Sequence, residues 1–159
     1  MYSIIGGIAF LNIPKCGSST LRSLEVYRAQ ARERFRYKKR IAFMRHPEDR
    51  FQSGYRFFNK IKLFVPKSCI GNYENYVDWA LESDDEHVMP QSHFLTLYGD
   101  DTVTEILDLN CMTEYLESIV KHQVDVVNST IQEPLSNTYR AADIALKYAK
   151  DLEIYNVLC

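Results

Sequence analysis

The feature that most constrains the fold is a short apolar segment that runs directly into a turn and then into a helix. Residues Ser3 to Ile13 are rich in Ile, Ala, Phe and Leu and end in the turn sequence Pro-Lys-Cys-Gly. A short apolar run bounded by turn residues is typical of a buried strand. From about Ser19, leucines recur at helical spacing, so we expect a buried strand, a tight loop and a helix in that order.

The same alternation continues along the chain. "RIAFM" (40–44) predicts a second strand, and Pro47 fits the first turn of a helix that reaches Lys60. "NYENYVDWALES" predicts a helix, "DDEHVMPQSH" an irregular stretch, "TVTEILDL" a strand, "CMTEYLESIVKH" a helix and "VDVVNST" a strand and turn. "NTYRAADIALKYAKDLEIYNVL" predicts one long amphipathic helix whose apolar face holds Ala142, Ala145 or Leu146, Ala149 and Leu152. This order predicts an α/β fold with a parallel sheet.

Length and composition predict one soluble domain over residues 1–159. The net charge of −2 provides no field that would favour nucleic acid or an anionic membrane. No stretch approaches the roughly 20 apolar residues of a membrane span, and the N-terminus lacks the basic leader of a signal peptide. The four cysteines are scattered, which favours reduced thiols, a cytoplasmic location and no metal site.

Basic residues are concentrated between Arg28 and Arg40, where seven Lys or Arg face a single acid, Glu33. Such a run is either a solvated helix face or a docking surface for an anionic ligand. Both interpretations remain open.

The loop "NIPKCGSSTLRS" (12–23) predicts an anion site. The start of a helix presents unpaired N–H groups and a partial positive charge. Lys15 adds a cation, and Gly17 lets the backbone approach a ligand closely. Ser18, Ser19 and Thr20 add hydroxyl donors. The lysine precedes the glycine, so the loop is not a Walker A motif.

Two other interpretations of this loop stay open. Cys16 and Arg22 have the Cys-x5-Arg spacing of a cysteine-dependent phosphatase, in which Cys16 would be the thiolate nucleophile and Arg22 a bidentate clamp. Alternatively, the loop is a plain connection between a strand and a helix.

A second motif, "IAFMRHPEDRFQSGYRFF" (41–58), favours a phosphate ligand. Arg45 should lie at the carboxyl end of a strand, where open α/β sheets bind their ligands. Arg50 and Ser53 should share a helix face, and a guanidinium and a hydroxyl that converge suit a terminal phosphate.

Together these segments resemble the sulfotransferase family. "FLNIPKCGSSTL" resembles its 5′-phosphosulfate loop, and "RHPEDRFQSGYRFF" resembles its 3′-phosphate motif, with His46 in place of the usual Asp. "DDEHVMPQ" and "YAKDLEIYN" are similar to two further segments of the carbohydrate sulfotransferase branch. The four segments occur in the order of the family and span nearly the whole chain.

The resemblance implies sulfuryl transfer from 3′-phosphoadenosine 5′-phosphosulfate (PAPS) to an acceptor hydroxyl or amine, with a carbohydrate as one acceptor class. The product would be adenosine 3′,5′-bisphosphate (PAP). The implied fold is a three-layer α/β sandwich whose central parallel sheet is P-loop-like and flanked by helices. Lys15 would contact the bridging oxygen, Arg45 and Ser53 the 3′-phosphate, and the loop residues Cys16, Gly17, Ser18, Ser19 and Thr20 the 5′-phosphosulfate.

A base must accept the proton of the acceptor, and a histidine suits this role because its pKa lies near neutrality. His46 lies within the donor motif and His122 ends a helix, so we select His87 in "DDEHVMPQ" over these and His93. A loop histidine paired with Asp85 or Glu86 is the structural alternative. A non-catalytic module that binds a nucleotide or polyanion is the remaining alternative for the whole chain.

Overall fold

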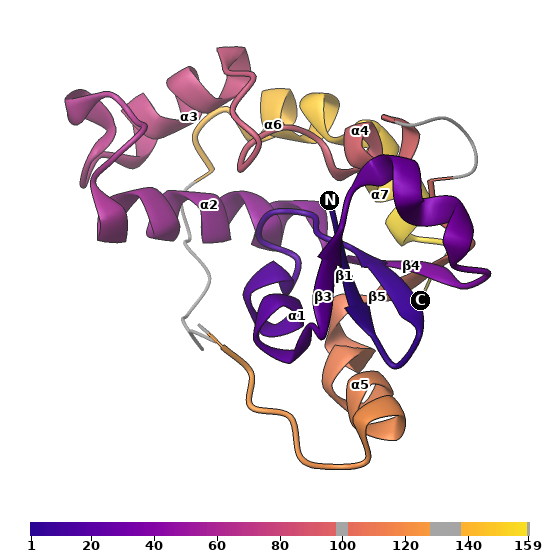
Figure 1. Cartoon of the computed structure of the whole chain (residues 1–159). Coiled ribbons are helices and arrows are strands. Elements are labelled where there is room, and N and C mark those ends of the chain that lie inside the picture. The colour runs from indigo at the N-terminus through magenta and orange to yellow at the C-terminus, as the bar shows by residue number, and fades with distance from the viewer. Residues whose placement is uncertain (98–101, 128–137, 159) are drawn as a thin grey trace.

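The computed structural model describes residues 1–97, 102–127 and 138–158. It is an α/β fold built on one five-stranded sheet with the strand order β3-β1-β2-β4-β5 (Figure 1). The strands are β1 (Tyr2–Ile5), β2 (Ile8–Leu11), β3 (Tyr27–Ala29), β4 (Arg40–Met44) and β5 (Glu105–Asp108). The helices are α1 (Ser18–Leu24), α2 (Pro47–Ile61), α3 (Tyr73–Glu82), α4 (Gln91–Thr96), α5 (Met112–Val120), α6 (Ala141–Lys147) and α7 (Ala149–Tyr155), with 3₁₀ turns η1 (Ala31–Arg36), η2 (Lys67–Cys69) and η3 (Leu109–Cys111).

The sheet is mixed, which corrects the predicted parallel sheet. The apolar N-terminal segment is two strands, because Gly6 and Gly7 turn the chain with φ angles of 56° and 77°. Strand β1 therefore runs antiparallel to β2 and to β3, while β2, β4 and β5 are mutually parallel. Two consecutive positive φ angles are the requirement of a tight hairpin turn, and Gly-Gly is a usual sequence for it. This was the signal that the prediction of one strand overlooked.

Helices cover both faces of the sheet, as expected for a layered sandwich. On one face, Phe10 and Phe43 stack with ring centres 5.9 Å apart and pack with Leu116 of α5 and Leu21 of α1. The other face is covered by α4 and α7, whose buried side chains include Leu95 and Tyr155. Figure 1 shows these two helix pairs on opposite sides of the strands.

A third group of helices, α2, α3 and α6, lies beside the sheet and has its own core. Aromatic rings dominate this core, which includes Phe51, Phe58, Tyr76 and Tyr148. Gly54 allows the close contact of α2 with α3, because a Cβ atom at this position would lie 2.6 Å from the Tyr76 hydroxyl oxygen.

Several predicted elements agree with the structure, among them the second strand and the helices that begin at Pro47 and near Asn72. The predicted single C-terminal helix is wrong, since it is divided at Tyr148, which has φ −106° and ψ 17°. Its predicted apolar face is also wrong: Ala142, Ala149 and Leu146 are exposed, and Leu152 is only half-buried. The residues that this segment buries are Tyr148, Asp151 and Tyr155.

Two further predictions concern the stretch "VDVVNST" and the basic segment 28–40. Residues 124–127 of "VDVVNST" form no strand, and the remaining three residues of that stretch lie outside the described part. The basic segment 28–40 comprises β3, the 3₁₀ helix η1 and the start of β4 rather than one continuous helix. Within the described residues, Arg28 pairs with Glu25, Arg36 with Glu33, and Lys39 with Glu105.

Candidate functional site

The carboxyl ends of β2 and β4 lie at the same edge of the sheet, because these two strands are parallel neighbours. Lys15 follows β2 in the loop before α1, and Arg45 follows β4 directly. The two predicted donor-site cations thus leave adjacent strands at one edge. They also interact electrostatically, since the charge of Arg45 contributes to lowering the pKa of Lys15.

Lys15 is a half-buried cation among other cations. Its backbone is left-handed, with φ 66°, and its Nζ atom lies 4.3 Å from the centre of the Phe57 ring. Burial and then the positive charges of Arg45, Arg50 and Lys60 lower the pKa of Lys15 to about 8. Burial and like charges both disfavour the protonated form of a lysine. An anion bound next to Nζ would reverse this effect.

His87, the predicted base, lies on the same aromatic ring as Lys15. Its imidazole stacks on Phe57 with ring centres 4.6 Å apart and an interplanar angle of 17°. Its Nδ1 atom lies 2.9 Å from Oδ1 of Asp85. The lysine and the histidine, which are far apart in the sequence, are therefore both within 5 Å of one ring centre. The pairing with Asp85 is also the one that the structural alternative predicted.

Arg50 is a structural residue rather than part of a phosphate contact. Its side chain is buried, and its guanidinium donates to three backbone carbonyls: Nε to Pro14 (3.0 Å), Nη1 to Met89 (2.7 Å) and Nη2 to Glu86 (3.1 Å). The prediction that its guanidinium converges with the Ser53 hydroxyl on a phosphate is therefore wrong. Instead, Arg50 connects the loop of Lys15 to the segment of His87.

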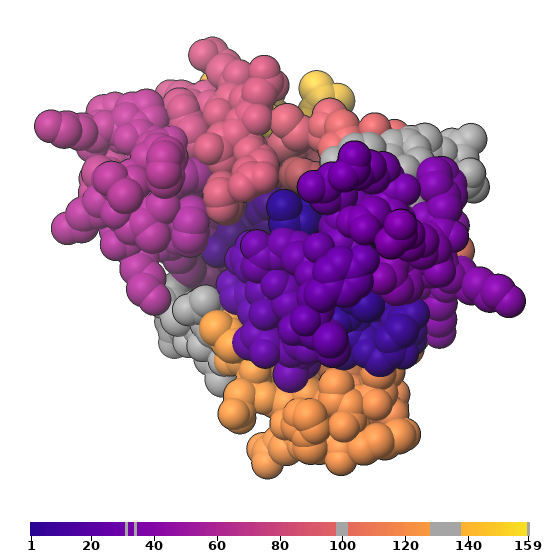
Figure 2. Space-filling view, in the orientation of Figure 1, coloured from indigo at the N-terminus to yellow at the C-terminus, as the bar shows by residue number. Residues whose placement is uncertain are grey.

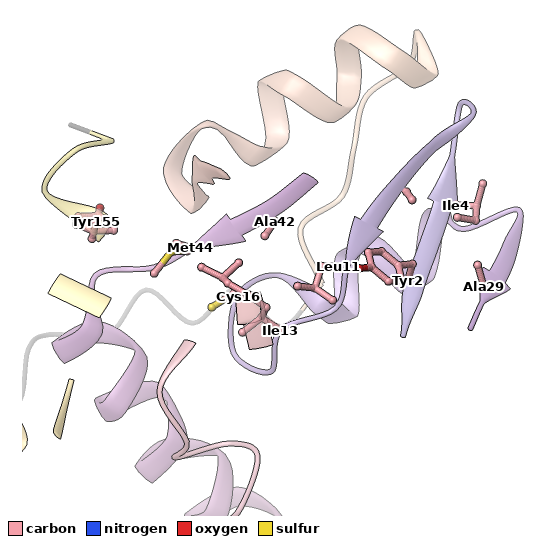
Figure 3. Packing of buried hydrophobic residues seen from close by; sticks show 11 residues of the cluster. Tyr2, Ile4, Leu11, Ile13, Cys16, Ala29, Ala42, Met44 and Tyr155 are labelled. Atoms are coloured by element: carbon pink, nitrogen blue, oxygen red, sulfur yellow. The ribbon is translucent and has the colours of Figure 1, made fainter. Parts of the chain in front are cut away.

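Gln91 makes a second buried connection. Its side-chain amide bonds to both backbone groups of Arg45: Nε2 donates to the carbonyl (2.8 Å), and Oε1 accepts from the N–H (2.9 Å). The same Oε1 accepts from the Cys16 thiol at 2.8 Å. Gln91 thereby fixes the backbone orientation of Arg45 relative to the loop that follows β2. Figure 3 shows Cys16 among the buried side chains next to Met44, the last residue of β4.

The C-terminal helices complete this network. The buried carboxylate of Asp151 accepts from the N–H groups of Gln91 (2.7 Å) and Ser92 (2.8 Å), and thus caps α4. The Tyr148 hydroxyl donates to the carbonyl of Val88, and the Tyr155 hydroxyl donates to Oδ2 of Asp108 at 2.7 Å. We call the set Arg50, Gln91 and Asp151 the polar clasp.

No role was predicted from the sequence for Gln91, Asp151 or Phe57. The signal for the first two was present in the quoted motifs, since "DDEHVMPQ" ends at Gln91 and "YAKDLEIYN" contains Asp151. Both side chains are fully buried, although glutamine and aspartate are usually exposed. Phe57 carried no signal beyond helical spacing.

The phosphatase interpretation of the loop is disfavoured by the surroundings of Cys16. The side chain is 1% exposed, and burial raises the pKa of its thiol. A nucleophilic cysteine needs an accessible sulfur and a lowered pKa. Arg22 is exposed on α1.

The other residues of the loop also contribute to the packing of the fold. Gly17 has φ 76°, and a Cβ atom there would lie 2.4 Å from Sδ of Met112. The Thr20 side chain is buried, and its hydroxyl accepts from the N–H of Val127 at 3.0 Å. Ser18, Ser19 and, on α2, Ser53 are half-buried.

Figure 2 shows atoms of the N-terminal segment at the floor of a recess between the region of α1 and the segment that precedes α4. Two shallow hollows of about 530 and 460 Å³ lie elsewhere, the first at the end of α5 and the second around α4 and Lys150. Within the described residues, no cluster of His, Cys, Asp and Glu could hold a metal ion. No helix there is long and apolar enough to cross a membrane.

Comparison with known proteins gives no match to a family model, to a curated protein or to a solved structure.

Proposed function

We propose that the chain binds PAPS where β2 and β4 end and transfers its sulfuryl group to an acceptor hydroxyl or amine. One observation carries this proposal: the four segments that resemble the sulfotransferase motifs are joined by the polar clasp. Arg50 of the second segment bonds the first and the third, and Asp151 of the fourth bonds Gln91 of the third. Chance matches scattered along a chain would have no reason to share one buried network.

The electrostatics of the edge support an anionic ligand. Burial and then the cationic neighbours of Lys15 lower its pKa to about 8, so at neutral pH it is still mainly protonated and its charge is repelled by Arg45 and Arg50. A phosphosulfate group next to Nζ would relieve this repulsion. During in-line transfer, charge builds up on the leaving phosphate oxygen, and a cation placed at that oxygen stabilises the transition state. We assign this role to Lys15 and the 3′-phosphate to Arg45 and Ser53.

The surroundings of His87 support its role as the base. When Asp85 accepts the proton of Nδ1, the lone pair of the imidazole is on Nε2, where it can accept the proton of an attacking hydroxyl. Phe57 fixes the plane of the ring by stacking. Asp85 is then a positioning residue, and Phe57 sets the spacing between the base and Lys15.

The test is calorimetry with PAP, followed by a screen of hydroxyl and amine acceptors with labelled PAPS. We expect binding of PAP by the wild type, and transfer to at least one acceptor class. His87→Ala should abolish turnover and leave PAP binding intact. Absence of PAP binding would contradict the proposal. Binding of PAP without transfer to any acceptor would instead favour the non-catalytic nucleotide-binding module, and unchanged turnover of His87→Ala would exclude His87 as the base.

A further inference from the structure

The end of α2 farthest from the sheet carries an exposed apolar tip. After Ile61 the chain turns through residues 62–67 before α3 begins, and Leu63 and Phe64 at this turn are 59% and 79% exposed. We call residues 62–67 the α2–α3 turn. In Figure 1 it lies at the far end of the helical group, and in Figure 2 this region forms a protruding lobe.

The backbone holds this tip in an uncommon conformation. Phe64 has φ 62°, which is rare for a bulky side chain. The turn is fixed at its base, because the N–H of Lys62 donates to the Phe58 carbonyl (2.8 Å) and the N–H of Gly71 donates to Oδ1 of Asn59 (2.6 Å). The aromatic side chain therefore gains neither burial nor a favoured backbone conformation. An outlier of this kind is a reason to look for a function.

Basic residues flank the tip in the sequence. Between Asp49 and Glu74 the sequence contains five basic residues and no acid, although the whole chain has a net charge of −2. Three of these residues, Lys60, Lys62 and Lys67, are exposed on either side of Leu63 and Phe64. Leu63 and Phe64 are therefore an exposed apolar pair flanked by three lysines, Lys60, Lys62 and Lys67, which we call the lysine collar.

We propose that the α2–α3 turn docks on an anionic lipid surface. Leu63 and Phe64 would enter the boundary between headgroups and acyl chains, and the lysines would contact the headgroups. Lysine stems can lie along apolar surface while the ammonium stays in water. The lysines can therefore contact the headgroups while Leu63 and Phe64 are buried. A protein groove could accept two apolar side chains, but three exposed lysines that flank the tip in the sequence are matched best by a surface that is anionic throughout.

This inference does not depend on the proposed function, because the tip is separate from the polar clasp. It also concerns a contact at the membrane surface and not a span. Overall charge and the lack of a long apolar stretch predicted no membrane partner, but neither criterion detects a local tip of two apolar residues.

Sedimentation with lipid vesicles tests the inference. We expect the wild type to bind vesicles of mixed phosphatidylcholine and phosphatidylserine, to bind phosphatidylcholine alone much more weakly, and to dissociate as salt is raised. The double variant Leu63→Ser, Phe64→Ser should bind the mixed vesicles at least about 30-fold more weakly, because the burial of two large apolar side chains is lost. Lys62→Glu with Lys67→Glu should weaken binding by about 10-fold or more.

Matched controls separate position from composition. Leu146→Ser removes a leucine that is 77% exposed on α6, and Lys38→Glu reverses an exposed charge in the basic segment; neither should change vesicle binding by more than about 2-fold. Lys60 is left unchanged because its charge acts on Lys15. Circular dichroism would verify that the exposed-site variants fold. A wild type that stays in the supernatant with mixed vesicles, or tip variants that bind like the wild type, would overturn the inference.

Discussion

Arg50 and Lys15 are two cations at the same sheet edge with opposite surroundings. Arg50 is fully buried, and its guanidinium donates three hydrogen bonds to backbone carbonyls. Lys15 is half-buried over an aromatic ring, and burial and its cationic neighbours lower its pKa to about 8. The hydrogen-bond donors of Arg50 are used within the fold, whereas the charge of Lys15 would be neutralised by a bound anion.

The difference teaches how structural and ligand-binding charges can be told apart. A guanidinium presents five donors in a fixed fork, so it can join three carbonyls from separate segments, and removing it would leave those acceptors unpaired. A lysine ammonium is a compact charge on a flexible stem and changes its pKa readily when buried. Deleting each cation should therefore have opposite effects on stability and on ligand binding.

The largest expected effect is on the stability of Arg50→Ala. The variant leaves the carbonyls of Pro14, Glu86 and Met89 without their donor, and we expect a loss of about 3–5 kcal/mol in the free energy of unfolding. Urea denaturation measures it. Arg22→Ala is the matched control, because Arg22 is exposed on α1 and its removal should change stability by less than about 0.5 kcal/mol. A loss below about 1 kcal/mol for Arg50→Ala would show that Arg50 is not the main connection between the loop of Lys15 and the segment of His87.

The next effect is on the ligand chemistry of Lys15→Met. This variant removes the cation that we assign to the leaving oxygen, so the rate of sulfuryl transfer should fall by roughly 10²–10³-fold. PAP binding should also weaken, while the free energy of unfolding at neutral pH should stay the same or rise, since the cost of burying the charge and the repulsion from Arg45 and Arg50 are removed. Transfer rates and PAP calorimetry measure the loss of catalysis and of ligand binding, and urea denaturation of the same preparation measures stability. A variant that loses stability like Arg50→Ala would remove the distinction between the two cations.

The sequence predicted local features better than the way in which they are connected. It placed Lys15 after one strand and Arg45 after the next, because an apolar run that ends in a polar turn is a local signal. It also placed Pro47 at the start of α2. The hairpin was missed because Ile4, Ile5 and Ile8 look the same in one strand as in two, and only the Gly6-Gly7 pair distinguishes these cases.

The polar clasp could not be predicted from residue types alone. Gln91 and Asp151 are polar, and polar residues are usually exposed, so their burial depends on partners that are 46 and 60 residues away in the sequence. The same reason explains why the apolar face of the C-terminal helices was assigned wrongly. Periodicity favoured Ala142 and Leu146, whereas the structure buries an aspartate and two tyrosines that have hydrogen-bond partners in other segments.

Gly54→Ala tests how tightly the helical group is packed against the segment of His87. The new Cβ would lie 2.6 Å from the Tyr76 hydroxyl and 3.4 Å from the His87 carbonyl. Overpacking of this kind costs about 1–3 kcal/mol, partly offset by the roughly 0.5–1 kcal/mol that alanine gains over glycine in a helix. We expect a net loss of about 1 kcal/mol by urea denaturation. Adding Tyr76→Phe removes the hydroxyl that the Cβ meets, so the double variant should be more stable than the sum of the single effects predicts. Strict additivity would contradict the contact.

The last effect is the pH dependence that Lys15 gives to stability. Its pKa is about 8 in the folded protein and 10.5 in the unfolded chain, so between these values the unfolded state binds more protons. The penalty for folding with a protonated Lys15 is fully present below pH 8 and disappears as the pH rises toward 10.5. The difference in unfolding free energy between the wild type and Lys15→Met should therefore shift in favour of the wild type across this range. Taking this difference cancels the titration of the tyrosines and of the other lysines, which both proteins share. A difference that does not change with pH would mean that Lys15 has an ordinary pKa, and the electrostatic contrast with Arg50 would then rest on geometry alone.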